Sequence, residues 1–216
     1  MSSEKLLWYY DFISPFAYLQ STKLDEFADS ASLECRPLLF AGLLDHWSNV
    51  GPAEIPPKRN WTFQHVTWLA HRDKIAFSLP AWHPFNPLPL LRLALALDNR
   101  VDAVQRIYRW VWVEGHVPQN ETALTALLEE YALTPEDINT PVIKTQLRRN
   151  GELAIEQGVF GVPTLVAGEQ IFWGYDATEM AHAYLQRGLG SERWPADAIE
   201  QTIQLPEGPG RNRPRP

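Results

Sequence analysis

Two apolar segments near the N-terminus predict a β-α-β unit. Residues 5–12 and 32–40 consist largely of apolar side chains, which is typical of buried strands. Between them, large apolar residues recur at the spacing of one helical face: Phe16, Leu19, Leu24 and Phe27. A helical connection of this length favours parallel pairing of the two strands through a right-handed crossover.

From about residue 42 the pattern changes to loops rich in Pro and Gly, followed by a series of helical segments. The predicted helices cover residues 61–76, 87–98, 101–114 and 121–132. Asn86-Pro87 and Asn120-Glu121 mark two helix starts, because Asn accepts hydrogen bonds from free helix amides and Pro is tolerated at the first helical position. The sequence therefore predicts an all-helical insertion.

The strand pattern returns only after one more helix, over residues 141–157, which stops at Gly158. Residues 163–167 and 170–173 predict two short strands joined by a Gly-containing hairpin. A last helix begins near Ala177. The predicted order is thus β-α-β, a helical insertion, and then α-β-β-α, which defines an α/β fold.

This order predicts a discontinuous domain organisation. We expect residues 1–40 and 141–190 to form one α/β domain and residues 41–140 to form the inserted helical domain. The tail over residues 191–216 is rich in Pro, Gly and Arg and contains the single aromatic residue Trp194, so we expect it to be partly disordered.

Composition narrows the possible functions. With 216 residues and 45% apolar content, the chain can bury a self-sufficient core. Its single cysteine, Cys35, cannot form an internal disulfide, so we expect a reducing compartment, the cytoplasm by default, and no dithiol redox centre. The start of the chain lacks the pattern of a secretory signal.

The net charge and the absence of known binding motifs disfavour nucleic acid, membranes, metals and nucleotides as partners. The net charge of -7 offers no general attraction to nucleic acid or to an anionic membrane. The most apolar segment, Leu88 to Leu97, is far shorter than the roughly 20 residues that cross a bilayer. The six His show no metal-ligand spacing such as H-E-x-x-H, and no phosphate-binding glycine motif is present, so we expect neither a metal nor a nucleotide.

Ser14-Pro15 is the first candidate for chemistry, because it follows the first strand and opens the first helix. Unpaired amides in the first helical turn favour an anion, and the Ser14 hydroxyl adds a donor. Ser is also among the best residues for capping a helix, and Ser-Pro is a common helix opening. The two roles are compatible, so residues 14 and 15 alone leave both open.

Several short motifs together resemble one family. They are DF-x-SP-x-x-YL at Asp11 to Leu19, Asn49 followed by Lys58, Asn86 followed by Arg92, GVFGVPT at 158–164, and FWGYD at 172–176. In this order they resemble the 2-hydroxychromene-2-carboxylate isomerases and the related kappa-class glutathione transferases, from residue 6 to residue 187. The resemblance implies a thioredoxin-like fold of the DsbA type, with a helical domain inserted between its halves.

The resemblance also implies a cofactor and assigns residues to it. Glutathione would bind with its sulfur at the catalytic Ser14, and the other cofactor-binding residues would be Asn49, Lys58, Val162, Pro163, Tyr175 and Asp176. The bond between Val162 and Pro163 would be cis, with its backbone edge facing the tripeptide. A small aromatic substrate would meet Phe16, Trp82, Asn86 and Arg92, and the protein would be a homodimer.

Each of these residues also has a structural interpretation. Asp176 begins a D-A-T-E sequence that resembles a capping box, and Asn86 is a candidate helix cap. Pro163 is tolerated at the start of a strand without a ligand, an exposed Lys58 is ordinarily solvated, and Arg92 on an apolar helix could extend to water.

The sequence departs from the family pattern near the expected substrate pocket. Val50-Gly51-Pro52, Trp61 with His65, and His83 stand where the family often has other residues. The expected activity is glutathione-dependent isomerisation of an aromatic catabolic intermediate. Two alternatives are a kappa-like transferase and a non-catalytic binding protein, whereas a dithiol oxidoreductase is disfavoured because the tetrad that opens the helix is Ser14-Pro15-Phe16-Ala17.

Overall fold

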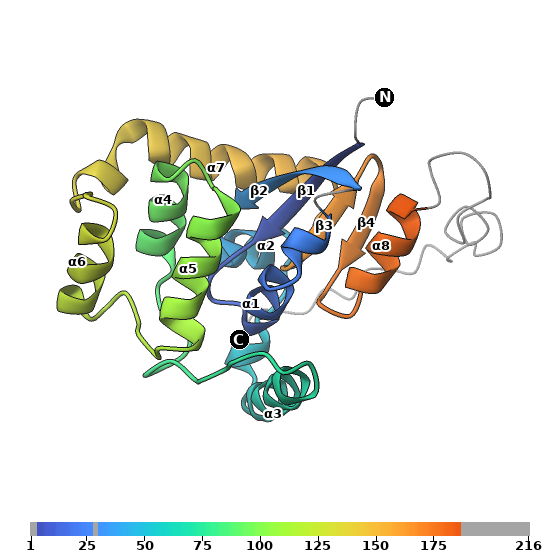
Figure 1. The fold of residues 1–216 in the computed structure, drawn as a ribbon, viewed down its shortest axis with the longest axis horizontal. Coiled ribbons are helices and arrows are strands. Elements are labelled where there is room, and N and C mark those ends of the chain that lie inside the picture. Colours follow the sequence, from blue (N-terminus) through green and yellow to red (C-terminus); the bar gives the residue numbers. More distant parts are fainter. Residues whose placement is uncertain (1–3, 28–29, 187–216) are drawn as a thin grey trace.

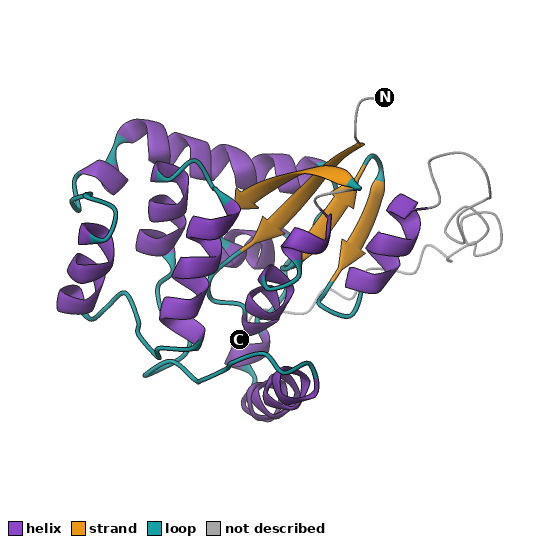
Figure 2. Cartoon of the chain, viewed as in Figure 1, coloured by secondary structure: helices purple, strands orange, loops and turns teal. Residues whose placement is uncertain are grey.

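A four-stranded sheet forms the centre of the fold (Figures 1 and 2). The computed structural model describes residues 4–27 and 30–186. The strands are β1 (Glu4–Tyr10), β2 (Ala31–Pro37), β3 (Thr164–Ala167) and β4 (Gln170–Trp173). Their order is β2-β1-β3-β4; β1 is parallel to β2 and antiparallel to β3, and β3 is antiparallel to β4. This is the sheet of a thioredoxin-like fold, as expected.

Helices surround the sheet and extend beyond one end of it. Those next to the sheet are α1 (Pro15–Ser21), α2 (Phe40–His46), α7 (Pro141–Glu156) and α8 (Thr178–Gln186). Helices α4 (Leu88–Ala96), α5 (Val101–Trp112) and α6 (Glu121–Glu129) stand beside it, and α3 (Pro56–Arg72) lies at the lower edge of Figure 1. Short 3-10 turns cover Leu24–Phe27, Pro52–Glu54 and Asp137–Asn139.

The alternation of β1 side chains produces two cores. Leu6, Trp8 and Tyr10 point into the larger core, which they share with α1, α4, α5, α6 and α8. Leu7 and Tyr9 point to the opposite face, where a smaller core forms with α2 and α7. Because both faces of β1 are covered by helices, the strand is apolar from Leu6 to Tyr10 and does not alternate with polar residues there.

Most of the expected elements are confirmed, including two helix starts. Asn120 caps α6 by accepting a hydrogen bond from the Ala123 amide at 3.2 Å. The side chain of Asn86 accepts one from the Leu88 amide at 3.1 Å, where α4 begins. The bond between Val162 and Pro163 is cis, as the resemblance implied.

Two expectations are wrong near the start of the insertion. Residues 38–40 do not extend the second strand, because β2 ends at Pro37 and α2 begins at Phe40. The buried Asp11 carboxylate accepts a hydrogen bond from the Phe40 amide at 2.9 Å, so a residue distant in sequence stabilises the start of this short helix. The next helix, α3, begins at Pro56 and not near residue 61, so Lys58 lies inside its first turn.

The expected tail at 191–216 lies outside the described residues, and the domain boundaries stay a prediction. Among the described helices, none has the length and apolarity needed to cross a membrane.

Candidate active site

Ser14 caps the first helix and also contacts the second half of the fold. Its hydroxyl oxygen accepts a hydrogen bond from the Ala17 amide at 3.2 Å, which is the N-cap interaction. The same hydroxyl lies 3.4 Å from the carbonyl oxygen of Val162, to which it donates. Because 3.4 Å is long for a hydroxyl donor, this second bond is weak and the hydroxyl can turn towards another acceptor.

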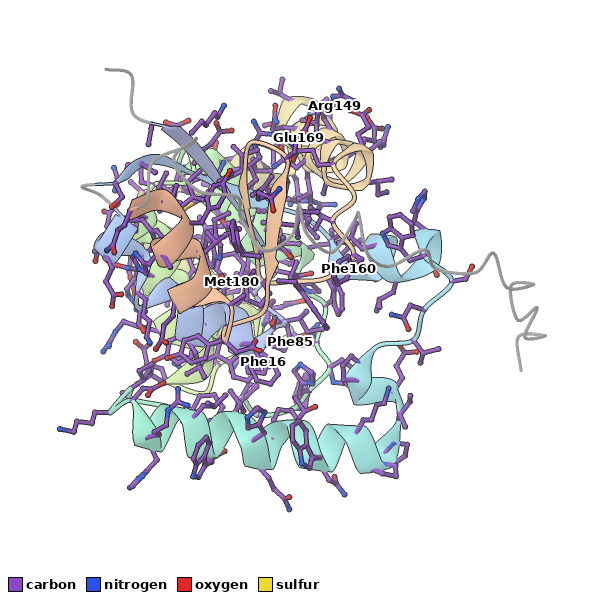
Figure 3. All side chains as sticks on the ribbon, turned by 90° about the vertical axis from the view of Figure 1, so that its right-hand side faces the viewer. Phe16, Phe85, Arg149, Phe160, Glu169 and Met180 are labelled. Carbon is purple, nitrogen blue, oxygen red and sulfur yellow. The ribbon has the colours of Figure 1, made fainter. Side chains whose placement is uncertain are left out.

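A cavity of about 600 Å³ lies next to this contact. It is lined by five of the residues assigned from the family motifs: Phe16, Val162, Pro163, Tyr175 and Asp176. They come from α1, from the turn before β3 and from the turn between β4 and α8. Figure 3 shows Phe16 between α3 and the rest of the protein. The fold therefore brings together segments that are far apart in the sequence.

The turn after β4 depends on a glycine. Gly174 has φ +97, a conformation that L side chains rarely adopt, and a Cβ there would lie 2.5 Å from an oxygen of Asp176. The Asp176 side chain is exposed, lines the cavity and has no hydrogen-bond partner among the described residues. The capping-box interpretation of Asp176 is therefore not supported here, and its carboxylate is available to a cationic ligand group.

Tyr175 holds the same turn against α3. Its hydroxyl donates to the Asp73 carboxylate at 2.6 Å. Two hydrogen bonds, with a stronger effect from Arg72 and a smaller one from Tyr175, lower the pKa of Asp73 to about 2. The Lys23 ammonium lies 4.9 Å from the centre of the Tyr175 ring and also lines the cavity. Because the Tyr175 hydroxyl already donates to Asp73, the ring and the backbone of Tyr175 are the parts available to a ligand.

Gln20, in α1, connects that helix to the turn that contains Gly174 and Asp176. It donates to the Gly174 carbonyl at 3.1 Å and to the Thr178 hydroxyl at 2.9 Å, and it accepts from the Trp8 indole at 2.7 Å. Gln20 and Thr178 are buried, so this network fixes the distance between α1 and the Asp176 turn. Sequence reasoning missed Gln20, since a single Gln in a helix carries no signal of its partners.

One face of α3 supplies an aromatic wall. The sequence placed Trp61 and His65 near the expected substrate pocket, as departures from the family pattern, but it assigned them no role and gave no sign of Trp68. Trp61, His65 and Trp68 line the cavity, and the two Trp side chains are 60% and 58% exposed. The ring of His65 lies 4.5 Å from that of Trp61 and 5.8 Å from that of Phe16. The spacing of four and then three residues was visible in the sequence, but it did not reveal whether this face met a cavity or water.

Six assigned residues do not line this cavity. Ser14 is one of them: its side chain is buried behind the lining residues Phe16 and Val162. Asn49 and Lys58 are exposed on the loop before α3 and on its first turn. Trp82 and Asn86 are exposed between α3 and α4. Arg92 lines a different cavity, and its guanidinium donates to Asn139 at 2.5 Å. Their assignment to glutathione or substrate stays a prediction.

The buried Asp11 and the half-buried His83 support the segment that leads to Ser14. Asp11 accepts a hydrogen bond from the Ile13 amide at 3.1 Å, and burial raises the pKa of its carboxyl to about 7. A ring nitrogen of His83 lies 2.9 Å from the Ile13 carbonyl oxygen, so that nitrogen must carry the proton. Burial lowers the pKa of His83, which favours the neutral ring. Both groups hold the backbone that precedes Ser14.

The family model of the DSBA-like thioredoxin domain matches residues 5–186. Since this match covers most of the chain, the protein belongs to the DSBA-like thioredoxin domain family.

Within that family, the chain is similar to isomerases and transferases. It is 27% identical over 187 residues to 2-hydroxychromene-2-carboxylate isomerase of Sphingobium xenophagum, covering 82% of this chain and 96% of that protein. It is 24% identical over 209 residues to glutathione S-transferase kappa 1 of Rattus norvegicus, covering 86% and 90%. A solved structure of 2-hydroxychromene-2-carboxylate isomerase superimposes with a TM-score of 0.74 at 22% identity, covering 85% and 95%.

Proposed function

We propose that this protein binds glutathione beside Ser14 and uses its thiolate to isomerise 2-hydroxychromene-2-carboxylate or a similar aromatic catabolic intermediate. One observation carries the proposal: a single cavity is lined by Phe16, by the Val162-Pro163 turn and by Asp176, and the Ser14 hydroxyl contacts the carbonyl of its lining residue Val162. The similarity to an isomerase and to a glutathione transferase over most of the chain supports it.

The nucleophile has to come from the cofactor. The protein's single cysteine, Cys35, is buried in β2, and burial raises the pKa of its thiol to about 12. A thiol with such a pKa is inert at neutral pH. A glutathione sulfur placed at the start of α1 would instead meet the Ser14 hydroxyl and the amides of the first turn.

These donors are strong enough to ionise the bound thiol. Lowering a thiol pKa from 8.5 to about 6.5 requires roughly 2.7 kcal/mol of preference for the thiolate. One hydrogen bond to a charged group contributes about 1.5 to 3 kcal/mol, and a helix terminus about 0.3 to 2 kcal/mol. The weak bond from Ser14 to the Val162 carbonyl costs little to break, so the hydroxyl can donate to sulfur. No general base is then needed.

Charged groups at the other end of the cavity suit the γ-glutamyl part of glutathione. The unpartnered carboxylate of Asp176 can bind its ammonium, and Lys23 can bind its carboxylate. The cysteinyl backbone of the tripeptide would pair with the edge beside Val162. The aromatic ring of the substrate would rest between Phe16 and the Trp61 face of α3.

The reaction needs no net consumption of glutathione. The thiolate adds to an electrophilic carbon of the substrate, and the ring oxygen leaves as the ring opens. The former double bond is now a single bond, about which the adduct rotates. Elimination then re-forms the double bond and returns the thiolate.

An absorbance assay on 2-hydroxychromene-2-carboxylate, with and without glutathione, tests this proposal. We expect turnover only with glutathione, and a loss of about 10²-fold in Ser14→Ala, the effect of removing one preorganised donor to a reacting anion. Thiol titration should show that glutathione is retained. Equal rates in the two proteins would remove Ser14 from the mechanism.

The same assay separates the alternatives. Stoichiometric loss of thiol with an aromatic electrophile would identify a transferase, which forms the adduct and releases it. Absence of glutathione binding in calorimetry at millimolar concentrations would indicate a non-catalytic member of the family.

A further inference from the structure

A second cavity, of about 440 Å³, lies between α2, α4 and α7 and shares no lining residue with the one beside Ser14. In Figure 1, α7 follows the upper edge of the molecule and α3, which lines the first cavity, follows the lower edge. Five aliphatic side chains form its apolar wall: Leu39, Leu43, Leu88, Leu147 and Ile155. Its volume is within the range of about 300 to 1,000 Å³ typical of small-molecule sites.

The rim of this cavity carries an excess of positive charge. Arg92, Lys144 and Arg148 line it, against a single carboxylate, Glu152, which pairs with Arg149 at 3.3 Å. Lys144 and Arg148 are exposed, and neither has an ion pair within the described chain. Three cations gathered on one cavity, in a protein of net charge -7, are complementary to an anion.

Arg92 brings a guanidinium to the cavity that the protein engages only in part. One terminal nitrogen of its guanidinium binds Asn139, but its Nε atom is buried and has no hydrogen-bond partner among the described residues. Nε is too buried to meet a ligand in the cavity, but the second terminal nitrogen donates to no described residue and is available to a ligand oxygen.

Two glycines in helices line the cavity. Gly42 in α2 and Gly151 in α7 both line it, and neither has a positive φ. A Cβ at either position would meet no atom within 4 Å, so close helix packing does not explain them. Glycine inside a helix is less stable than alanine. Because open space adjoins Gly151, a large side chain at that position can project into the cavity, whereas alanine leaves it open.

We propose that this cavity binds a small hydrophobic monocarboxylate. The apolar body of the ligand lies against Leu43 and Leu147, and its carboxylate accepts hydrogen bonds from Arg92 and Arg148. Bare phosphate fits less well, because the wall is aliphatic and phosphate offers no apolar surface. This site is separate from the proposed glutathione reaction and does not depend on it.

Calorimetric titration with 1-naphthoate, without glutathione, tests the proposal. We expect saturable binding to the unaltered protein and a loss of about tenfold or more in Gly151→Leu, which fills the cavity, and in Lys144→Gln/Arg148→Gln. Gly151→Ala is the matched control and should retain binding. Lys5→Gln/Arg100→Gln, which removes two cations elsewhere, should also retain it. Thermal unfolding verifies that each variant is folded.

Further titrations identify the chemistry of the ligand and the cavity in which it binds. Octanoate in place of 1-naphthoate distinguishes an aliphatic from an aromatic body, and 1-naphthalenemethanol tests the need for the carboxylate. Trp61→Ala, in the other cavity, should leave naphthoate binding unchanged. Equal binding of the alcohol, equal binding by Gly151→Leu, or a loss confined to Trp61→Ala would each overturn the proposal.

The other possible occupant is a second copy of this chain. Sedimentation of the unaltered protein and of Gly151→Leu detects it. If naphthoate fails to bind and Gly151→Leu converts a dimer into a monomer, the cavity is part of a subunit interface and the proposal is wrong.

Discussion

The hydroxyl oxygen of Ser14 lies 3.4 Å from the carbonyl oxygen of Val162, although 148 positions separate the two residues. The contact joins the start of α1 to the turn before β3, the two places where the family motifs are most distinctive. Both strands that lead to these residues are neighbours in the sheet, because β1 pairs with β3. The sheet therefore determines the geometry of the candidate site.

Ser14→Gly should separate helix capping from thiolate binding. Glycine at an N-cap costs only a few tenths of a kcal/mol relative to Ser, whereas alanine costs about 1 kcal/mol. We expect Ser14→Gly to unfold in urea almost as the unaltered protein does, yet to lose about 10²-fold in glutathione-dependent rate. If the rate loss appeared only in Ser14→Ala, in proportion to lost stability, Ser14 would be a cap and nothing more.

Trp61→Ala should weaken substrate binding without weakening the fold. The Trp61 side chain is 60% exposed, and surface substitutions usually change the free energy of unfolding by less than about 0.5 kcal/mol. Loss of aromatic contact should raise KM for an aromatic substrate severalfold to about tenfold. Steady-state kinetics measure this.

Trp82→Ala is the matched control for that experiment. Trp82 is 51% exposed but does not line the cavity, so we expect its KM to be unchanged. The reverse outcome, with Trp82→Ala raising KM and Trp61→Ala neutral, would favour the assignment made from sequence over the one made from geometry.

Asp11→Asn should change how stability depends on pH. Burial raises the pKa of Asp11 from 3.8 to about 7, so the folded state holds this proton more tightly than the unfolded state does. Between about pH 4 and about pH 7 the unfolded chain has lost this proton while the native protein still holds it, so the free energy of unfolding falls as pH rises. Above pH 7 no further loss is expected from this group.

Urea denaturation of both proteins across this range measures the effect. The stability of the unaltered protein relative to Asp11→Asn should decrease by at most about 4 kcal/mol between pH 4 and pH 7 and then remain constant. Asn removes the titration but leaves the side-chain volume nearly the same. A difference that does not vary with pH would mean that the Asp11 carboxyl titrates normally.

Gly174→Ala should damage the γ-glutamyl end of the proposed glutathione site. Alanine is strained at φ +97, and its Cβ would displace the Asp176 carboxylate. We expect a loss of roughly 1 kcal/mol or more in stability and at least about tenfold weaker glutathione binding in calorimetry. Gly115→Ala, at φ +79 away from the cavity, should lose stability but retain glutathione affinity. Equal affinity losses in both would indicate a general effect on the fold.

Local patterns were sufficient for most of the fold. Apolar runs predicted β1 and the β3-β4 hairpin, and Asn120 predicted the start of α6, because strand periodicity and helix capping involve neighbouring residues. Helix α2 was missed for the opposite reason. It has only seven residues, and the group that binds its first amide is Asp11, 29 positions earlier in the chain.

The residues of the candidate site were likewise predicted only in part from the sequence. Motifs were enough to group Phe16, Val162, Pro163, Tyr175 and Asp176, which the fold places around one cavity. They could not show that Arg92 lines another cavity, or that the His65 ring lies 5.8 Å from that of Phe16. Sequence spacing determines which residues share a face of a helix, but the direction of that face depends on how the helix packs.

By itself, then, the sequence determined the elements, their order and the serine that opens the first helix, since these depend on periodicity and on bonds between close neighbours. Only the tertiary structure decided which helix faces enclose each cavity and which buried groups support Ser14. Those outcomes depend on contacts between distant segments, whose free energies arise only when the sheet and both helical layers are assembled.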